Sequence, residues 1–121
     1  MAKGRLFLIH WNGAEGQELV RELEGLGWHV DLEAQDGARA GKRIREVSPE
    51  AVVIFLSRLP SHGRETAHAL RSFKSTRQLP IIFVDGQDEA VQKTREKVPE
   101  ALFVRKDLLQ TTLEQVVRKK G

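Results

Sequence analysis

Four short apolar runs form the strongest pattern in the chain. None contains an alternating polar residue, and each is rich in residues that favour β-strands; they cover positions 6–9, 52–56, 81–84 and 101–104. Continuous apolar runs of this length are typical of strands buried on both faces of a parallel sheet. A fifth stretch, 28–34, alternates apolar and polar residues. That alternation predicts a half-exposed strand at the edge of the sheet.

Segments with helical spacing lie between these runs. They cover positions 14–26, 38–47, 64–75 and 89–98. A last helix is expected to begin between 107 and 112, where Thr111 followed by Glu114 forms a candidate capping box. Strict alternation of strands and helices predicts a three-layer αβα sandwich over 1–121, with a five-stranded parallel sheet and right-handed crossovers. Functional residues of such folds lie at the carboxyl ends of the strands.

The composition narrows the available chemistry. A chain of 121 residues fits one domain with its own core. The absence of cysteine excludes disulfides, thiolate zinc sites and iron–sulfur clusters, and it suits a reducing cytoplasm. The net charge of +3 is mild, and no apolar stretch approaches the length of a membrane span or a signal-peptide core. We therefore expect a cytoplasmic protein with no membrane association.

Polar residues at the predicted strand ends suggest one enzymatic interpretation. His10, Ser57, His62 and Asp85 would converge on one rim in a small enzyme or ligand-binding protein of the flavodoxin-like type. However, the Gly-x-Ser-x-Gly pattern of a nucleophile elbow is absent around Ser57. Two histidines without a third matched ligand make a weak metal site, so no metal is expected. We keep this interpretation as the alternative.

Nucleotide and nucleic-acid binding are weakly supported. Gly13 and Gly16 lack the first glycine of a dinucleotide fingerprint, because Trp11 stands in its place, and no P-loop is present. No cofactor is therefore expected. Basic residues on the second predicted helix are mostly interleaved with acidic ones, which is typical of a solvated face. Nucleic acid is accordingly an unlikely partner.

An ordered set of short motifs extends along the whole chain. Positions 49–54 lead into the third strand, Leu59-Pro60 with Gly63 follows it, and positions 79–84 contain the fourth. The fifth strand ends in Phe103-Val104-Arg105-Lys106. This set resembles the receiver domain of bacterial two-component response regulators. The resemblance implies a flavodoxin-like sheet of order 2-1-3-4-5, a role in signal transduction and phosphorelay, and Mg²⁺-assisted phosphoryl transfer to an aspartate.

The residues at the family's phosphorylation positions do not suit that chemistry. The matched positions hold His10 and Trp11 for the acidic pair, Leu56 for the phospho-acceptor, and Asp85 for the hydroxyl residue; Lys106 alone is retained. Mg²⁺ requires oxygen ligands, and the phosphoryl group requires a carboxylate nucleophile. The resemblance therefore indicates a degenerate pseudo-receiver with a vestigial phosphorylation pocket. We expect it to be non-catalytic and to hold no metal.

Two hypotheses concern what fills that pocket. Asp85 and Lys106 end adjacent strands, so their side chains are expected to pair there, either fixing one conformation or forming a solvated pair of little energy. Trp11 is expected either to plug the emptied site by packing near Leu59 and Pro60 or to contact a partner, since tryptophan is a common interface anchor.

The resemblance also implies where a partner binds. Phe103 matches the family's switching aromatic, although a static aromatic is the simpler interpretation. The face made by the fourth helix, fifth strand and fifth helix is the family's usual partner surface, and a homodimer through it is one expected form of the interaction. The sequence therefore predicts a module that acts through an unidentified signalling or regulatory protein.

Overall fold

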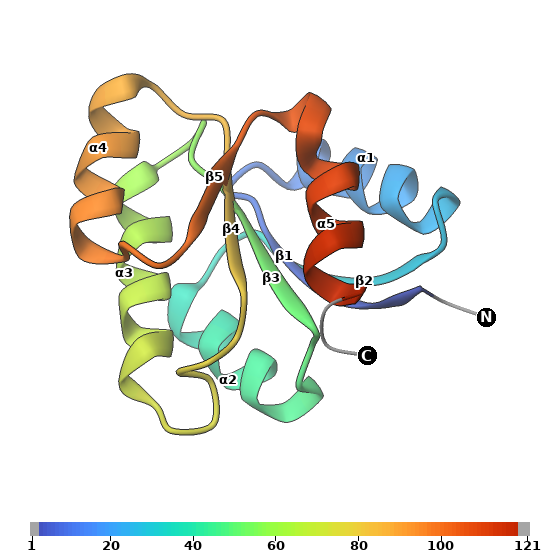
Figure 1. The fold of residues 1–121 in the computed structure, drawn as a ribbon, viewed down its shortest axis with the longest axis horizontal. Coiled ribbons are helices and arrows are strands. Elements are labelled where there is room, and N and C mark those ends of the chain that lie inside the picture. Colours follow the sequence, from blue (N-terminus) through green and yellow to red (C-terminus); the bar gives the residue numbers. More distant parts are fainter. Residues whose placement is uncertain (1–2, 119–121) are drawn as a thin grey trace.

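The computed structural model describes residues 3–118 and contains five strands, five α-helices and one 3₁₀ turn. Strands and helices alternate as the sequence predicts (Figure 1). Among these residues no helix is both long and apolar enough to cross a membrane. In chain order the elements are β1 (Gly4–Ile9), α1 (Gly13–Gly25), β2 (Trp28–Glu33), α2 (Gly37–Val47), β3 (Ala51–Phe55), α3 (Pro60–Ser72), β4 (Ile81–Val84), α4 (Asp88–Lys97), β5 (Leu102–Val104), the 3₁₀ turn η1 (Lys106–Leu108) and α5 (Leu109–Arg118).

All five strands pair in parallel, in the order β2-β1-β3-β4-β5. The predicted three-layer sandwich and sheet order are therefore confirmed. Helices α1 and α5 cover one face of the sheet, and α2, α3 and α4 cover the other (Figure 1). Because side chains alternate along a strand, each inner strand supplies both cores. In β1, for example, Leu6 and Leu8 join the cluster under α1 and α5, whereas Phe7 and Ile9 join the opposite one.

The strand β2 lies at one edge of the sheet, as its alternating pattern predicts. Trp28 is buried in the cluster under α1 and α5, and its Nε1–H donates a hydrogen bond of 2.9 Å to Gln110 Oε1 on α5. Trp28 is thus a packing residue. A buried indole keeps its N–H paired in this way, which ties the edge strand to the last helix.

The strand β5 forms the other edge, which corrects the expectation that its run is buried on both faces. Leu102 remains 43% exposed, and Phe103 and Val104 are half-buried. The physical reason is that β5 pairs only with β4. An apolar run alone does not distinguish an inner strand from one that ends the sheet.

One helix start and one helix cap differ from the prediction. The third helix begins at Pro60 rather than at position 64, since proline is well tolerated in a helix's first turn, where its missing N–H is not needed. The predicted capping box of Thr111 and Glu114 is wrong, because η1 leads directly into α5 at Leu109 and Thr111 lies inside that helix.

The close approach of α3 to β3 depends on Gly63. A Cβ at this position would lie 2.8 Å from Ile54 Cγ2, closer than carbon atoms pack in folded proteins. The absence of a side chain therefore lets the first turns of α3 lie directly on the sheet, beside the carboxyl ends of the strands.

Replacing Gly63 with alanine is expected to lower the free energy of unfolding by about 1–3 kcal/mol, because the new methyl group overpacks the core. Urea unfolding followed by circular dichroism measures the change. Gly25→Ala in α1 is the matched control, since no atom lies within 4 Å of its added Cβ. Both changes gain helix propensity, so equal stabilities would contradict the close packing at Gly63.

Candidate functional site

The carboxyl ends of β1, β3, β4 and β5 surround a hollow of about 170 Å³. Three of the five predicted pocket residues, His10, Asp85 and Lys106, line it, together with Ser57. The remaining lining is mostly from α1, with Glu15, Glu18, Leu19 and Glu22, and from Phe55 at the end of β3. The structure therefore assembles a site at the predicted edge of the sheet, but its acidic side chains come mainly from a helix.

His10 forms the inner wall of the hollow. Its ring is 2% exposed and stacks on Phe55 with centroids 4.8 Å apart. Nδ1 accepts a hydrogen bond of 3.3 Å from the Asn12 N–H, and Nε2 lies 3.7 Å from Glu15 Oε1. Burial lowers the pKa of His10, with Glu15 opposing the shift and Arg58 adding to it. The imidazole is therefore neutral near pH 7, and a neutral ring nitrogen is a poor substitute for the carboxylate oxygens that Mg²⁺ prefers.

The predicted ion pair between the Asp85 and Lys106 side chains is wrong. Asp85 Oδ1 instead accepts a hydrogen bond of 3.0 Å from the backbone N–H of Lys106, at the start of η1. Asp85 adopts a left-handed backbone with φ of 59°, and its own N–H donates to Val104 O. Lys106 Nζ lies 3.7 Å from Glu22 Oε1 on α1. The Asp85 carboxylate thus caps the backbone N–H of Lys106, and the Lys106 side chain pairs with Glu22 instead.

Acids of α1 balance the cations around the hollow. Besides the contact with Lys106, Glu15 Oε2 lies 3.0 Å from Arg58 Nη2 in the loop after β3. All four of these side chains are at least 42% exposed, so each pair contributes about 0–1 kcal/mol and does not lock a conformation. The strand-end pattern does not identify these acids. Glu15, Glu18 and Glu22 are spaced by three and four residues, which places them on one face of α1, and this spacing is the signal in the sequence.

Leu56, matched to the phospho-acceptor, belongs to the core rather than to this hollow. Its side chain is 2% exposed and packs in the cluster under α2, α3 and α4. Gly86, in a backbone with φ of 100°, passes so close that a Cβ there would lie 2.7 Å from Leu56 Cβ. The position therefore offers an apolar contact and no nucleophile.

Trp11 lies away from the hollow, which corrects its expected role as a plug. Its indole lines a groove where the first turn of α2 meets α3, and it makes an edge-to-face contact with His62 at 5.9 Å between centroids. His62 therefore does not converge with His10, Ser57 and Asp85, and the four-residue rim of the enzymatic alternative is not assembled. Within residues 3–118, no group of three or more histidine, aspartate or glutamate side chains is arranged to hold a metal ion.

Phe103 contacts both a second aromatic ring and a cation. It stacks on Phe83 of β4, with centroids 5.2 Å apart, and the Arg95 guanidinium of α4 lies 4.7 Å from its centroid. Such a contact between a cation and an aromatic ring contributes about 0.5–1 kcal/mol at an exposed site. These neighbours place Phe103 as a packed aromatic between β4 and α4.

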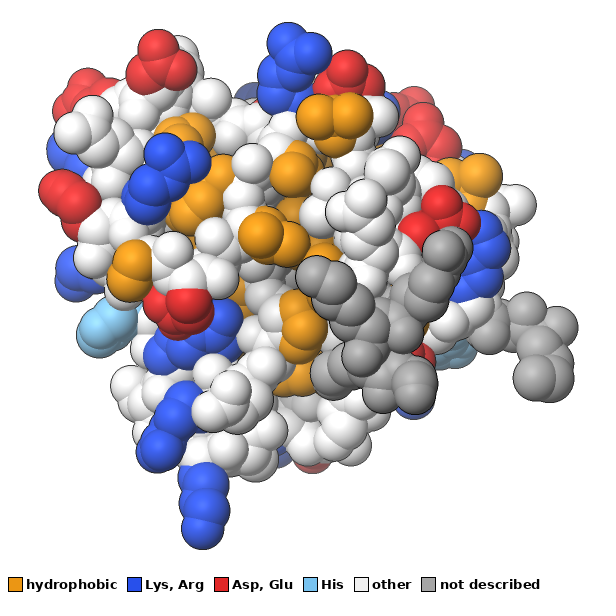
Figure 2. All heavy atoms as spheres, in the orientation of Figure 1, with side chains coloured by type: hydrophobic (Ala, Val, Ile, Leu, Met, Phe, Trp, Pro, Cys, Tyr) orange, Lys and Arg blue, Asp and Glu red, His pale blue; other side chains and the backbone are white. Residues whose placement is uncertain are grey.

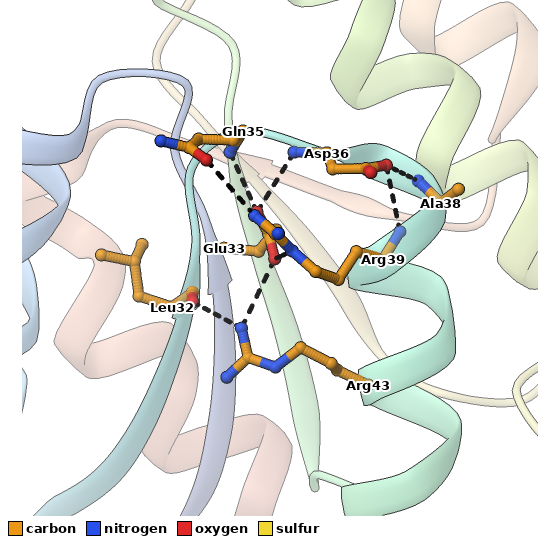
Figure 3. Close-up of polar contacts among 7 residues, drawn as sticks. All are labelled: Leu32, Glu33, Gln35, Asp36, Ala38, Arg39 and Arg43. Atoms are coloured by element: carbon orange, nitrogen blue, oxygen red, sulfur yellow. Dashed lines mark hydrogen bonds and ion pairs between the residues drawn. The ribbon is translucent and has the colours of Figure 1, made fainter.

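A buried carboxylate, Glu33, orders the loop between β2 and α2 (Figure 3). Its side chain is 2% exposed and accepts hydrogen bonds from the backbone N–H groups of Gln35 and Asp36. Arg39 adds a fork of two bonds, both 2.7 Å long, and Arg43 Nη1 lies 3.5 Å away while also donating to Leu32 O. This contact corrects the expectation that the arginines of α2 belong to a solvated face, since nothing local to α2 indicates a buried acid at the end of β2.

These donors lower the pKa of Glu33 to about 2, with the Arg39 hydrogen bonds as the largest cause. Burial acts in the opposite direction but is outweighed. A carboxyl whose pKa is lower in the folded chain stabilises the fold above its unfolded pKa and loses that contribution as the pH falls. Glu33 therefore stabilises this loop at neutral pH and stops doing so in acid.

Replacing Glu33 with glutamine is expected to lower the free energy of unfolding by about 3 kcal/mol at pH 7, because the change removes the charge that the arginines pair with. The difference from the unmodified chain should shrink between about pH 5 and pH 2, as Glu33 itself becomes protonated. Urea unfolding at a series of pH values measures both effects. Glu89→Gln, which alters a pair 80% exposed on its acidic side, is the control and should change stability by about 0.5 kcal/mol or less. A difference that is constant with pH would contradict the assignment.

The sequence matches no protein-family model and no curated protein. Solved structures do resemble it. A putative response regulator from Chloroflexus aurantiacus superposes with a TM-score of 0.80 at 20% identity, covering 95% of this chain and 98% of that one. A response-regulator signal receiver domain from Bermanella marisrubri gives 0.77 at 24% identity, covering 97% and 99%. The chemotaxis protein CheY4 of Vibrio cholerae gives 0.76 at 18% identity, covering 96% and 98%. With its sheet order of 2-1-3-4-5, the chain therefore has the flavodoxin-like fold of response-regulator receiver domains.

Proposed function

We propose that this protein is a receiver-like signalling module that is not phosphorylated and acts through protein–protein interaction in the cytoplasm. The receiver fold supports a signalling role. The observation that carries the proposal is the burial of Leu56 in an apolar cluster at the position of the phospho-acceptor. A leucine has no atom that can attack a phosphoryl group, so the module is expected to work without that covalent switch.

The surroundings of the hollow support the same conclusion. Aspartyl phosphorylation needs Mg²⁺ to neutralise the charge that develops on the phosphoryl oxygens. The end of β1 offers this hollow a neutral, buried imidazole, and the Trp11 indole lines the other groove. Asp85 is engaged as a cap on Lys106 N, and Lys106 Nζ lies 3.7 Å from Glu22 Oε1. The pocket is therefore organised around internal contacts.

Incubation with acetyl phosphate and Mg²⁺ is expected to leave the protein's intact mass unchanged. The reason is that Leu56 supplies no nucleophile and no acidic pair ends β1. Mass spectrometry measures the result, with a receiver domain that retains the full aspartate set as the positive control. A mass increase of one phosphoryl group on this chain, abolished by acid or base as acyl phosphates are, would sink the proposal.

We further propose that α4, β5 and α5 form the docking face. Hydrophobic side chains gather in a band between α4 and α5 (Figure 2). Leu102 on β5 is 43% exposed and Leu108 beside α5 is 51% exposed. The strand β5 also ends the sheet, so one side of its backbone lacks a partner strand within residues 3–118. Exposed apolar side chains along an unpaired strand edge favour association with another protein.

A second copy of the chain is the partner that can be tested directly. Analytical ultracentrifugation is expected to show a concentration-dependent dimer, which Leu102→Glu should weaken about tenfold or more by placing a charge in the apolar contact. Leu26→Glu is the matched control, because Leu26 is 46% exposed at the end of α1, just before β2 at the opposite edge of the sheet from β5. Equal dimerisation of the two variants would contradict a dimer through this face.

A further inference from the structure

The groove where the first turn of α2 meets α3 belongs neither to the hollow at the strand ends nor to the proposed docking face. It encloses about 520 Å³, a size in the range of sites that hold a side chain or small ligand. Its lining comes from the loop after β1, the start of α2 and one side of α3: Trp11, Gln35, Asp36, Gly37, Ala38, His62, Glu65, Thr66 and Ala69.

The indole of Trp11 spans the groove between the two helices. Its Cη2 end lies 3.9 Å from a Cβ built on Gly37, and its Nε1 end lies 3.8 Å from a Cβ built on Gly63. Gly37 also approaches Thr66, so α2 and α3 converge around the ring. The buried Nε1–H has no hydrogen-bond acceptor among the described residues. Within the described residues the indole is therefore positioned by packing and by its ring contact with His62.

The charge of the groove is negative, although the chain carries +3 overall. Asp36 and Glu65 are exposed on its rim, and no lysine or arginine is among its lining residues. The nearest cation on α2, Arg39, turns its guanidinium to Glu33 (Figure 3). Asp36 accepts from the Ala38 and Arg39 N–H groups, so its carboxylate also offsets the positive end of α2. The two carboxylates leave the groove suited to a cation.

We propose that this groove binds an arginine side chain of a partner protein. A guanidinium is planar, so it can stack on an indole while its N–H groups pair with carboxylates. Trp11 supplies the ring, and Asp36 and Glu65 supply the charge. The inference rests on the proposed function as an interaction module and adds a second contact surface, distant in sequence from α4, β5 and α5.

The test is a titration of the ¹⁵N-labelled protein with an acetylated and amidated Gly-Arg-Gly peptide. The chain has two tryptophans, and the Trp28 indole is already bonded to Gln110 on the other side of the sheet. Binding in the groove is expected to shift the Trp11 indole resonance in a saturable manner and leave that of Trp28 in place. The same peptide with citrulline, which keeps the shape but not the charge, is expected to bind about fivefold or more weakly.

Two substitutions separate charge from folding. Asp36→Asn keeps the helix cap, because asparagine caps as well as aspartate does, and Glu65→Gln is exposed. The double variant is expected to lose about fivefold or more in affinity for the arginine peptide, whereas Glu96→Gln on the exposed side of α4 should leave it unchanged.

Equal binding of the arginine and citrulline peptides, an unmoved Trp11 resonance, or full affinity in the double variant would each overturn the inference. None of these outcomes bears on phosphorylation. If acetyl phosphate leaves the chain unmodified and the arginine peptide does not bind, only the inference about the groove is refuted. If the chain is phosphorylated, the proposed function is refuted, and the titration still decides whether the groove binds arginine.

Discussion

The burial of β1, β3 and β4 on both faces is the constraint on which the rest of this structure depends. Their side chains feed two apolar clusters, one under α1 and α5 and one under α2, α3 and α4. Strands buried in this way leave no room for polar chemistry along their length. Polar residues accordingly gather beyond the strand ends, where the loops to the helices begin. The hollow, the groove and the Glu33 network all lie in that layer.

The local patterns carry most of the fold. Each inner strand is recognisable from its own four or five apolar residues, and each helix from its own periodicity. The exposure of Leu102 is different, because it depends on β5 having no further strand beside it within residues 3–118 and not on the β5 sequence. Glu33 is a similar case. Its alternating strand predicts an exposed acid, but arginines six and ten residues later cover it and make burial favourable.

The predicted site was only partly assembled for related reasons. His10, Asp85 and Lys106 do meet, since parallel strands bring their ends to one edge. The side-chain pairing within that set could not be predicted, because the left-handed backbone at Asp85 directs its carboxylate to the main chain of Lys106. Trp11 and His62 line the groove instead of the hollow, because of the direction in which the chain leaves β1 and enters α3. Those directions depend on how the helices pack on the sheet, which the local sequence does not specify.

The hollow and the groove differ in whether their charged side chains are paired. Around the hollow, the cations Arg58 and Lys106 meet acids of α1, so attraction is satisfied within the chain. Around the groove, two carboxylates and an indole remain without a cation from the lining residues. The charges of the hollow are therefore paired within the chain, whereas those of the groove are available to a ligand. Under the proposed function as an interaction module, the groove has the chemistry of a recognition surface.

The packing of Leu56 also has a consequence for how such a sequence can change over time. An aspartate at this position alone would put a charge into an apolar cluster, against the backbone turn at Gly86. Burying an unpaired charge destabilises a fold strongly. The carboxylates that would hold a metal beside it would have to replace His10 and Trp11 at the same time. An aspartate at position 56 is therefore expected to be tolerated only together with changes at neighbouring positions, because the cluster that surrounds the side chain is apolar.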